Sequence, residues 1–308
     1  MKKYVIAGGS GFIGKSLAQE LSKQAAEIVI LSRSPSNSTD QSYPGQREVY
    51  WDGATGGNWE QELEGTAAVV NLAGRSVDCL PTESNRKAIL ESRINSVQAI
   101  AGAIKKCKTP PPVLVQASSL AIYGDLEDQI CDEFSPDGNG FTTTVCRSWE
   151  DALTKQNLKE TRTVILRIGF ALASHGGALG KLAMLTRMFL GGAVGNGKQF
   201  ISWLHQDDLI RIILWSIQNP NASGAYNCCS PSPVTNAEFM KELRQALGRP
   251  WCPPAPAPFV KIGALIMGSD PSLALTGRRC VPKRLLDEGF SFNHTELRES
   301  LGSIYSDS

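Results

Sequence analysis

Residues 4–14 read YVIAGGSGFIG, in which four apolar residues lead into a glycine-rich turn. The apolar run at 4–7 predicts a short buried strand, and the apolar spacing over 12–24 predicts an amphipathic helix. In a strand–turn–helix of this kind, glycines permit the tight turn, let backbone amides approach a pyrophosphate, and let the helix pack closely on its strand. The phosphates then lie against the positive end of the helix. The stretch therefore predicts a dinucleotide-binding loop, with Gly8 or Gly9 as its first glycine, then Gly11 and Gly14.

The residues after the second predicted strand bear on the choice of dinucleotide. The strand at 28–31 is followed by Ser32-Arg33-Ser34. A site specific for NAD usually carries Asp or Glu here, to bind the ribose hydroxyls. A guanidinium instead binds a 2′-phosphate and stacks on adenine. Arg33 therefore favours NADP(H), and the alternative is a merely solvated arginine.

The rest of the chain extends the same alternation of strands and helices. Further mainly apolar strands are predicted at 67–72, 113–117 and 164–168, with a long helix at 85–106. This order is typical of an α/β fold with a Rossmann-type doubly wound parallel sheet. Beyond residue 170, glycine-rich loops, helices at 207–218 and 237–247 and a proline-rich stretch at 250–258 interrupt the pattern.

We therefore expect two units. Residues 1–168 should form the NADP-binding Rossmann domain, to which 205–228 returns. Residues 169–204 and 229–308 should form a smaller C-terminal substrate lobe.

The composition argues against nucleic acid and membrane as partners. The 31 basic and 30 acidic residues give a net charge of +1, and no basic run indicates nucleic-acid binding. No stretch approaches the roughly 18 apolar residues of a membrane span. We expect a cytoplasmic protein.

The eight cysteines have irregular spacing, which favours reduced thiols. The three histidines, His175, His205 and His294, are far apart and predict no metal site.

The chain resembles the extended short-chain dehydrogenases/reductases, and among them an atypical group of proteins similar to nucleoside-diphosphate-sugar epimerases. The resemblance runs nearly end to end. The segments that carry it are 8–14, 31–35, 51–52, 70–74, 91–93, 117–119 with 123–124, 149–150, 166–169, 175–179, 191–197, 203–208, 226–227, 281–282 and 289–292.

The resemblance implies a set of cofactor contacts. Those expected around the pyrophosphate, the 2′-phosphate and the adenosine are Gly8, Ser10, Gly11, Phe12, Ile13, Ser32, Arg33, Asp52, Leu72, Ala73 and Gly74. Ser118 and Gly169 are expected to face the nicotinamide. Arg93 is either a further cofactor contact or a surface salt bridge. Members of the superfamily often dimerise through two helices, so a homodimer is possible through the helix at 85–106.

The usual catalytic pair is missing. Active members carry Tyr-x-x-x-Lys, in which the lysine lowers the pKa of the tyrosine. The simplest alignment places Cys146 and Glu150 at those two positions. Cys146 is then a candidate proton donor or a small buried apolar residue. Glu150 is a base or part of a polar network. Ser119 lies four residues before Tyr123, the spacing of the family's catalytic serine; the alternative is a serine that bonds to its own backbone.

Two functions remain open from the sequence. The first is an NADP(H)-dependent oxidoreductase or epimerase acting on a small polar or sugar-nucleotide-like substrate. The second is a non-catalytic NADP(H) sensor that signals to a protein partner. The basic residues Arg278, Arg279, Lys283 and Arg284 either receive an anionic substrate or form a solvated face. His205 either faces the substrate or is structural.

Overall fold

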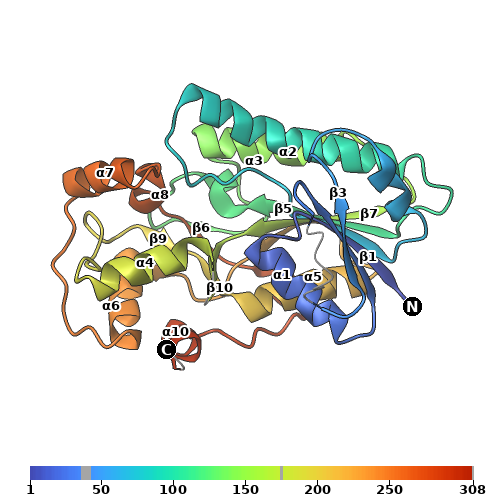
Figure 1. Cartoon of the computed structure of the whole chain (residues 1–308). Coiled ribbons are helices and arrows are strands. Elements are labelled where there is room, and N and C mark those ends of the chain that lie inside the picture. The colour runs from blue at the N-terminus through green and yellow to red at the C-terminus, as the bar shows by residue number, and fades with distance from the viewer. Residues whose placement is uncertain (36–42, 174–175, 307–308) are drawn as a thin grey trace.

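A computed structural model describes residues 1–35, 43–173 and 176–306. Its centre is a parallel sheet between two layers of helices (Figure 1). His175, which belongs to the segments quoted for the resemblance, lies outside the described residues. The strands of the central sheet are β1 (Lys3–Ala7), β2 (Glu27–Ser32), β3 (Gln46–Tyr50), β4 (Ala68–Asn71), β5 (Val113–Ser119), β7 (Arg162–Ile168) and β11 (Gly224–Cys228).

The strand order is β11-β7-β5-β4-β1-β2-β3, and every neighbouring pair is parallel. The chain runs outward from β1 to β3 and then returns to the other side of β1 as β4. This reversal confirms the predicted doubly wound sheet. Ligands of such sheets bind where the order reverses, outside the carboxyl ends of the strands. The expected crevice therefore lies beyond the ends of β1 and β4.

Helices cover both faces of the sheet because alternate strand residues point to opposite faces. Ile6 packs on one face with Leu17, and Val5 packs on the other with Ile100. Figure 1 shows α1 and α5 below the sheet and α2 and α3 above it. Their bounds are α1 (Phe12–Ser22), α2 (Glu83–Ile104), α3 (Phe141–Thr154) and α5 (Gln206–Gln218), with the 3-10 turns η1 (Asn58–Leu63) and η2 (Leu120–Tyr123).

The remaining elements gather at the left of Figure 1 and beneath the sheet. They have a core of their own, built around Trp203, Phe239 and Leu301. The elements are β6 (Ile130–Cys131), β8 (Phe170–Leu172), α4 (Gly177–Arg187), β9 (Phe200–Ile201), β10 (Trp203–His205), β12 (Val234–Thr235), α6 (Asn236–Ala246), α7 (Ala257–Ile266), α8 (Ser272–Leu275), β13 (Arg279–Cys280), α9 (Lys283–Asp287) and α10 (Leu297–Tyr305).

Several helix ends differ from the sequence expectation for local reasons. Helix α2 begins two residues before the predicted 85 because the Thr82 hydroxyl accepts the amide of Asn85 at 3.2 Å. Helix α5 begins at Gln206, capped by the His205 side chain. Within the described residues, no helix is both long and apolar enough to cross a membrane.

Candidate functional site

The loop between β1 and α1 is shaped by contacts that only glycine permits. Gly8 has φ +74°, and a Cβ there would lie 2.9 Å from the carbonyl oxygen of Leu72. A Cβ on Gly14 would lie 2.7 Å from the carbonyl oxygen of Gly9, so this glycine lets α1 press against the loop. No side chain caps the first turn of α1, and that turn contains no acidic residue. Its amides and dipole are therefore available to an anion.

The remaining predicted loop residues occupy the same turn. Gly11 is the N-cap of α1 and donates its amide to the Gly8 carbonyl at 3.2 Å. Ser10 is exposed, and Phe12 and Ile13 are half-buried at the start of the helix. A Cβ on Gly176 would lie 2.9 Å from that of Phe12, so the phenyl ring joins the loop to the start of α4. A phosphate at this helix end would thus lie between the sheet and the smaller lobe.

The adenosine side is formed by the ends of β2 and β3. Ser32 is buried, and its hydroxyl accepts the amide of Ser34 at 3.2 Å, which turns the chain. Arg33 projects exposed from this turn, and no hydrogen bond or ion pair links it to another described residue. Asp52 accepts two amides and the Thr55 hydroxyl, at 2.6 to 2.8 Å, and these bonds from Thr55 and Ala54 lower the pKa of its carboxyl. Asp52 therefore builds the adjoining turn, and its contact with adenine stays a prediction.

The end of β4 is held by a buried amide network. Asn71 donates to the Gln116 side chain at 2.8 Å, and its side-chain oxygen accepts the amide of Ala73 at 3.1 Å. This fixes the backbone of Leu72 and Ala73 against Gly8. Gly74 follows beneath the Arg93 side chain, where a Cβ would meet the guanidinium at 3.4 Å. The residues after β1 and β4 that were predicted to contact the cofactor therefore lie together where the strand order reverses.

Three predicted residues from separate elements line one pocket. Arg93 of α2, Ser119 at the end of β5 and Cys146 of α3 share it, within walls formed by Val77, Ile89, Phe141, Thr142, Val145 and Trp149. The Ser119 hydroxyl accepts the amide of Ala121 at 3.2 Å, the backbone bond named as its structural alternative. Its own hydrogen has no bond to a described residue. The pocket is thus mainly apolar, with the hydroxyls of Ser119 and Thr142 and one cation.

Arg93 carries the positive charge of this pocket. Its guanidinium lies 4.9 Å from the ring centre of Trp149 and donates to the carbonyls of Arg75 and Ile89 at 2.9 and 3.0 Å. No carboxylate pairs with it in the described part of the chain, so the surface salt bridge is not observed. Desolvation lowers the pKa of this guanidinium. An arginine nevertheless stays protonated, so the charge is available to a ligand.

Cys146 is buried, with 4% of its surface exposed. Burial and the nearby Glu150 raise the pKa of its thiol to about 12. The thiol is therefore protonated and weakly acidic at neutral pH, which favours packing over proton donation. A catalytic role of Cys146 stays a prediction.

Glu150, at the lysine position of the missing pair, belongs to a buried ion pair. Arg167 of β7 donates to both its carboxylate oxygens, at 3.0 and 2.8 Å, and the Ser118 hydroxyl donates at 2.6 Å. Arg167 also donates to the Tyr123 hydroxyl at 2.8 Å, and that hydroxyl donates to the side-chain oxygen of Asn227 at 2.8 Å. The network joins the ends of β5, β7 and β11. The Ser118 hydroxyl therefore helps to hold the Glu150 carboxylate in place. A contact of Ser118 with the nicotinamide stays a prediction.

Gly169 lies where β7 passes into β8. Its amide donates to the carbonyl of Cys228 at 3.0 Å, and a Cβ would collide with the carbonyl oxygen of Ser202. Glycine is therefore required here by the close approach of two backbones.

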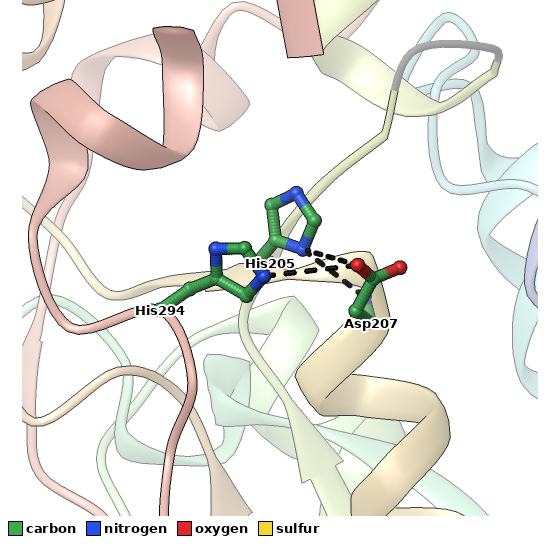
Figure 2. A group of neighbouring side chains, drawn as sticks. All are labelled: His205, Asp207 and His294. Atoms are coloured by element: carbon green, nitrogen blue, oxygen red, sulfur yellow. Dashed lines mark hydrogen bonds and ion pairs between the residues drawn. The ribbon is translucent and has the colours of Figure 1, made fainter. Parts of the chain in front are cut away.

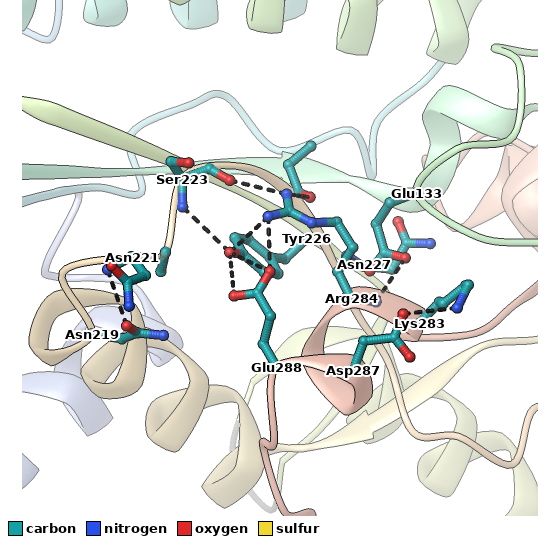
Figure 3. Close-up of polar contacts among 12 residues, drawn as sticks. Glu133, Asn219, Asn221, Ser223, Tyr226, Asn227, Lys283, Arg284, Asp287 and Glu288 are labelled. Carbon is teal, nitrogen blue, oxygen red and sulfur yellow. Dashed lines mark hydrogen bonds and ion pairs between the residues drawn. The ribbon is translucent and has the colours of Figure 1, made fainter.

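The C-terminal basic residues do not form one anion site. Arg284 lies 4.0 Å from the ring centre of Tyr226 and pairs with Glu288 at 2.9 Å, while Lys283 pairs with Asp287 at 2.7 Å (Figure 3). Arg278 instead donates to the carbonyl of Gly124 at 2.9 Å. Arg284 thus fastens α9 to β11 through the carbonyl of Ala225 and the Tyr226 hydroxyl, whereas Lys283 pairs within α9 and is exposed.

Sequence reasoning missed a contact between the loop that follows β4 and two later segments of the chain. Asp78, in the loop between β4 and α2, accepts hydrogen bonds from Lys181 of α4 and from Ser269 after α7. These residues are distant in sequence and belong to no recognisable motif, so only the fold brings them together.

Comparisons with known proteins agree with this geometry. A model described as "NAD dependent epimerase/dehydratase family" matches residues 4–229, and a second, "Domain of unknown function (DUF1731)", matches 255–304. The Arabidopsis thaliana "Epimerase family protein SDR39U1 homolog, chloroplastic" is 34% identical over 97% of this chain and 85% of its own length. Bacillus subtilis "Epimerase family protein YfhF" is 31% identical over 98% and 97%.

A solved structure is also similar over nearly the whole chain. The crystal structure of human epimerase family protein SDR39U1 (isoform 2) with NADPH superposes with a TM-score of 0.88 at 32% identity, and the match covers 99% of this chain and 100% of that one. Together with the family model, this confirms the resemblance drawn from the glycine loop and the later motifs. The chain belongs to the NAD dependent epimerase/dehydratase family, among the extended short-chain dehydrogenases/reductases.

Proposed function

We propose that this protein is an NADP(H)-dependent oxidoreductase that acts on a small carbonyl compound without a Tyr-x-x-x-Lys pair. The observation that carries the proposal is the pocket lined by both the Ser119 hydroxyl and the Arg93 guanidinium, which no carboxylate of the described residues pairs with. The glycine loop, the free guanidinium of Arg33 and the NADPH of the similar human structure support the choice of cofactor.

The residues suggest how the site works. Bound NADPH supplies a hydride to a carbonyl carbon. We expect Ser119 to donate a hydrogen bond to the carbonyl oxygen and Arg93 to stabilise the negative charge that develops there. Tyr123 cannot supply the proton: its hydroxyl is fully buried, bonded to Arg167 and Asn227, and desolvation raises its pKa. We expect the product oxygen to take its proton from water that enters the pocket, and the Cys146 thiol is the alternative donor.

The test is NADPH oxidation with a panel of small carbonyl compounds and nucleotide sugars. Arg93→Met should lower kcat/KM by about 100-fold, the usual effect of losing one charge-stabilising donor. Ser119→Ala should lower it as well. Lys87→Met is a matched control, because Lys87 lies on the same helix and is exposed, with only Glu91 nearby at 3.8 Å. Turnover of nucleotide sugars, with no turnover of small carbonyl compounds, would contradict the proposed substrate class.

If NADPH binds tightly and no compound of the panel is reduced, the result favours the second function, a non-catalytic NADP(H) sensor. A cytoplasmic location and a homodimer through α2 stay predictions.

A further inference from the structure

The pocket that contains Arg93 and Ser119 continues along α2 toward the beginning of that helix. The continuation is lined by Arg86, and it shares these walls with the part around Arg93: Val77, Ile89, Phe141 and Thr142. Arg86 and Arg93 are seven residues apart in α2. They therefore lie on one face of the helix, with a rise of about 10 Å between them. The two parts form one elongated pocket with an arginine in each.

The protein makes little use of the charge of Arg86. Its guanidinium carbon lies 5.1 Å from the ring centre of Phe141, and no hydrogen bond or ion pair joins it to another described residue. A guanidinium stays protonated, and its N–H donors point outward in its own plane. Stacking on the ring therefore leaves the donors free. Such a planar fork binds a carboxylate through two parallel hydrogen bonds.

The first turn of α3 adds to the positive potential at this end of the pocket. Phe141 and Thr142 begin α3, and both line the part of the pocket that contains Arg86. The N-cap residue Gly140 provides no side-chain cap, and the first turn contains no acidic residue. The free amides and the helix dipole therefore favour a negative charge next to Arg86.

One carboxylate lies at the same end. Among the described residues that line the two parts of the pocket, Asp270 alone is acidic. Its Oδ1 accepts the amide of Ser272 at 2.9 Å, and no ion pair joins it to Arg86. Two arginines and one carboxylate leave the pocket with a net positive charge.

The histidines described by the structure do not contribute to this charge. His205 stacks on His294 with the ring centres 3.7 Å apart, beside Asp207 at the start of α5 (Figure 2). The Nδ1 of His205 accepts the amide of Asp207 at 3.2 Å and so caps that helix. Neither imidazole lines either part of the pocket. A ligand there meets the charges of the arginines and of Asp270.

The surface between the two arginines is apolar. Ile89 lies between them in the sequence of α2, and Val77 and Phe141 complete the walls. A ligand that reaches from one arginine to the other passes this surface over about 10 Å. The pocket therefore suits a carbon chain that has few polar groups between its two ends.

We propose that the substrate is a carbonyl compound whose apolar chain ends in a carboxylate, and that Arg86 selects this anionic end. The inference rests on the proposed oxidoreductase function, in which Ser119 and Arg93 hold the carbonyl oxygen. NADPH is oxidised to NADP⁺ and the carbonyl group is reduced to an alcohol, while the carboxylate is unchanged. Arg86 determines specificity and takes no part in hydride transfer.

The test compares adipic semialdehyde with its methyl ester in NADPH oxidation by the full-length protein. The two compounds share the chain and the aldehyde, and they differ in charge. We expect kcat/KM for the acid to exceed that for the ester by at least about tenfold, the lower end of the effect of a charge-assisted hydrogen bond. In Arg86→Met the ratio of the two kcat/KM values should fall to about one.

Lys87→Met is the matched control, because it removes a neighbouring positive charge of α2 that is exposed and lines neither part of the pocket. At physiological salt, where charges more than about 8 Å apart are largely screened, it should keep the ratio within about twofold of the unaltered chain. Equal kcat/KM for acid and ester in the unaltered chain, or a preference for the acid that survives in Arg86→Met, would overturn the inference.

Binding separates this inference from the proposed function. If neither compound is reduced, the oxidoreductase function fails for this class, and hexanoate and hexanamide are then titrated by calorimetry into protein loaded with NADP⁺. Tighter binding of hexanoate that is lost in Arg86→Met would support a pocket selective for a carboxylate. Equal binding of the two compounds, or binding of neither, would overturn it.

Discussion

Replacing Arg167 with leucine tests the buried ion pair that stands where the family's catalytic lysine is missing. The change removes the two hydrogen bonds to Glu150 and the one to the Tyr123 hydroxyl. The side chains of Arg167 and Glu150 are only 11% and 12% exposed, so the carboxylate would be left buried with the Ser118 hydroxyl as its sole side-chain donor. Removing one partner of such a pair costs about 3–5 kcal/mol of unfolding free energy.

Urea unfolding at pH 7.5, followed by tryptophan fluorescence, measures this cost. In a separate thermal scan, the melting temperature should fall by roughly 6–10 °C at about 2 °C per kcal/mol. The double variant Glu150→Leu/Arg167→Leu should lose less than the single one, because an apolar pair leaves no buried charge. Lys87→Ala, which breaks an exposed pair, should cost less than about 1 kcal/mol. A loss below about 1 kcal/mol for Arg167→Leu would refute the reasoning.

Three further changes have definite expected outcomes. Gly14→Ala should destabilise the fold by at least about 2 kcal/mol and weaken NADPH binding, because its Cβ meets the backbone of Gly9; Gly180→Ala, with open space in α4, should be neutral or stabilising in the same denaturation assay. Cys146→Ala should keep turnover within about tenfold of the unaltered protein between pH 7 and 9. A general acid contributes about 10²–10⁴-fold, and a thiol with a pKa of about 12 does not titrate in this range. A larger loss of turnover, or a limb of the pH profile that vanishes with the thiol, would show that Cys146 is the acid. Asp78→Asn should raise the KM for NADPH, because it weakens the contact with Lys181 and Ser269 next to Val77, which lines the Arg93 pocket. An unchanged KM in steady-state kinetics would show that this contact does not position the pocket wall.

The parallel sheet was predictable because its inner strands are buried on both faces. The strand at 28–31 reads as a continuous apolar run, the strand at 113–117 is apolar except for Gln116, and the glycine loop marks the start of α1. The edge strand β3 was missed because its residues, QREVY, are mostly half-buried and polar. Helix α3 was also missed; after Phe141 its first turn is the β-branched run Thr142, Thr143 and Thr144, which has low helix propensity.

The cofactor side of the site was predictable to a larger extent than the substrate side. The loop residues are contiguous, so their geometry follows from local chemistry. The pairing of Glu150 with Arg167 joins α3 to β7, and no spacing in the sequence indicates it. The stacking of His205 on His294 depends on the path of the chain after α9, so the wide spacing of the two histidines does not indicate it.

The most direct test of the account compares NADPH and NADH binding to the unaltered chain and to Arg33→Ala, by nicotinamide fluorescence. Arg33 is exposed and makes no bond with the other described residues, so its loss should not disturb the fold. A charge-assisted contact with the 2′-phosphate is worth about 1.5–3 kcal/mol, or roughly 10- to 150-fold in affinity. We predict that NADPH binds at least about tenfold more tightly than NADH, and that Arg33→Ala removes this preference and weakens NADH binding much less than NADPH binding. Equal binding of the two cofactors, a preference that survives in Arg33→Ala, or no binding of either would contradict the account.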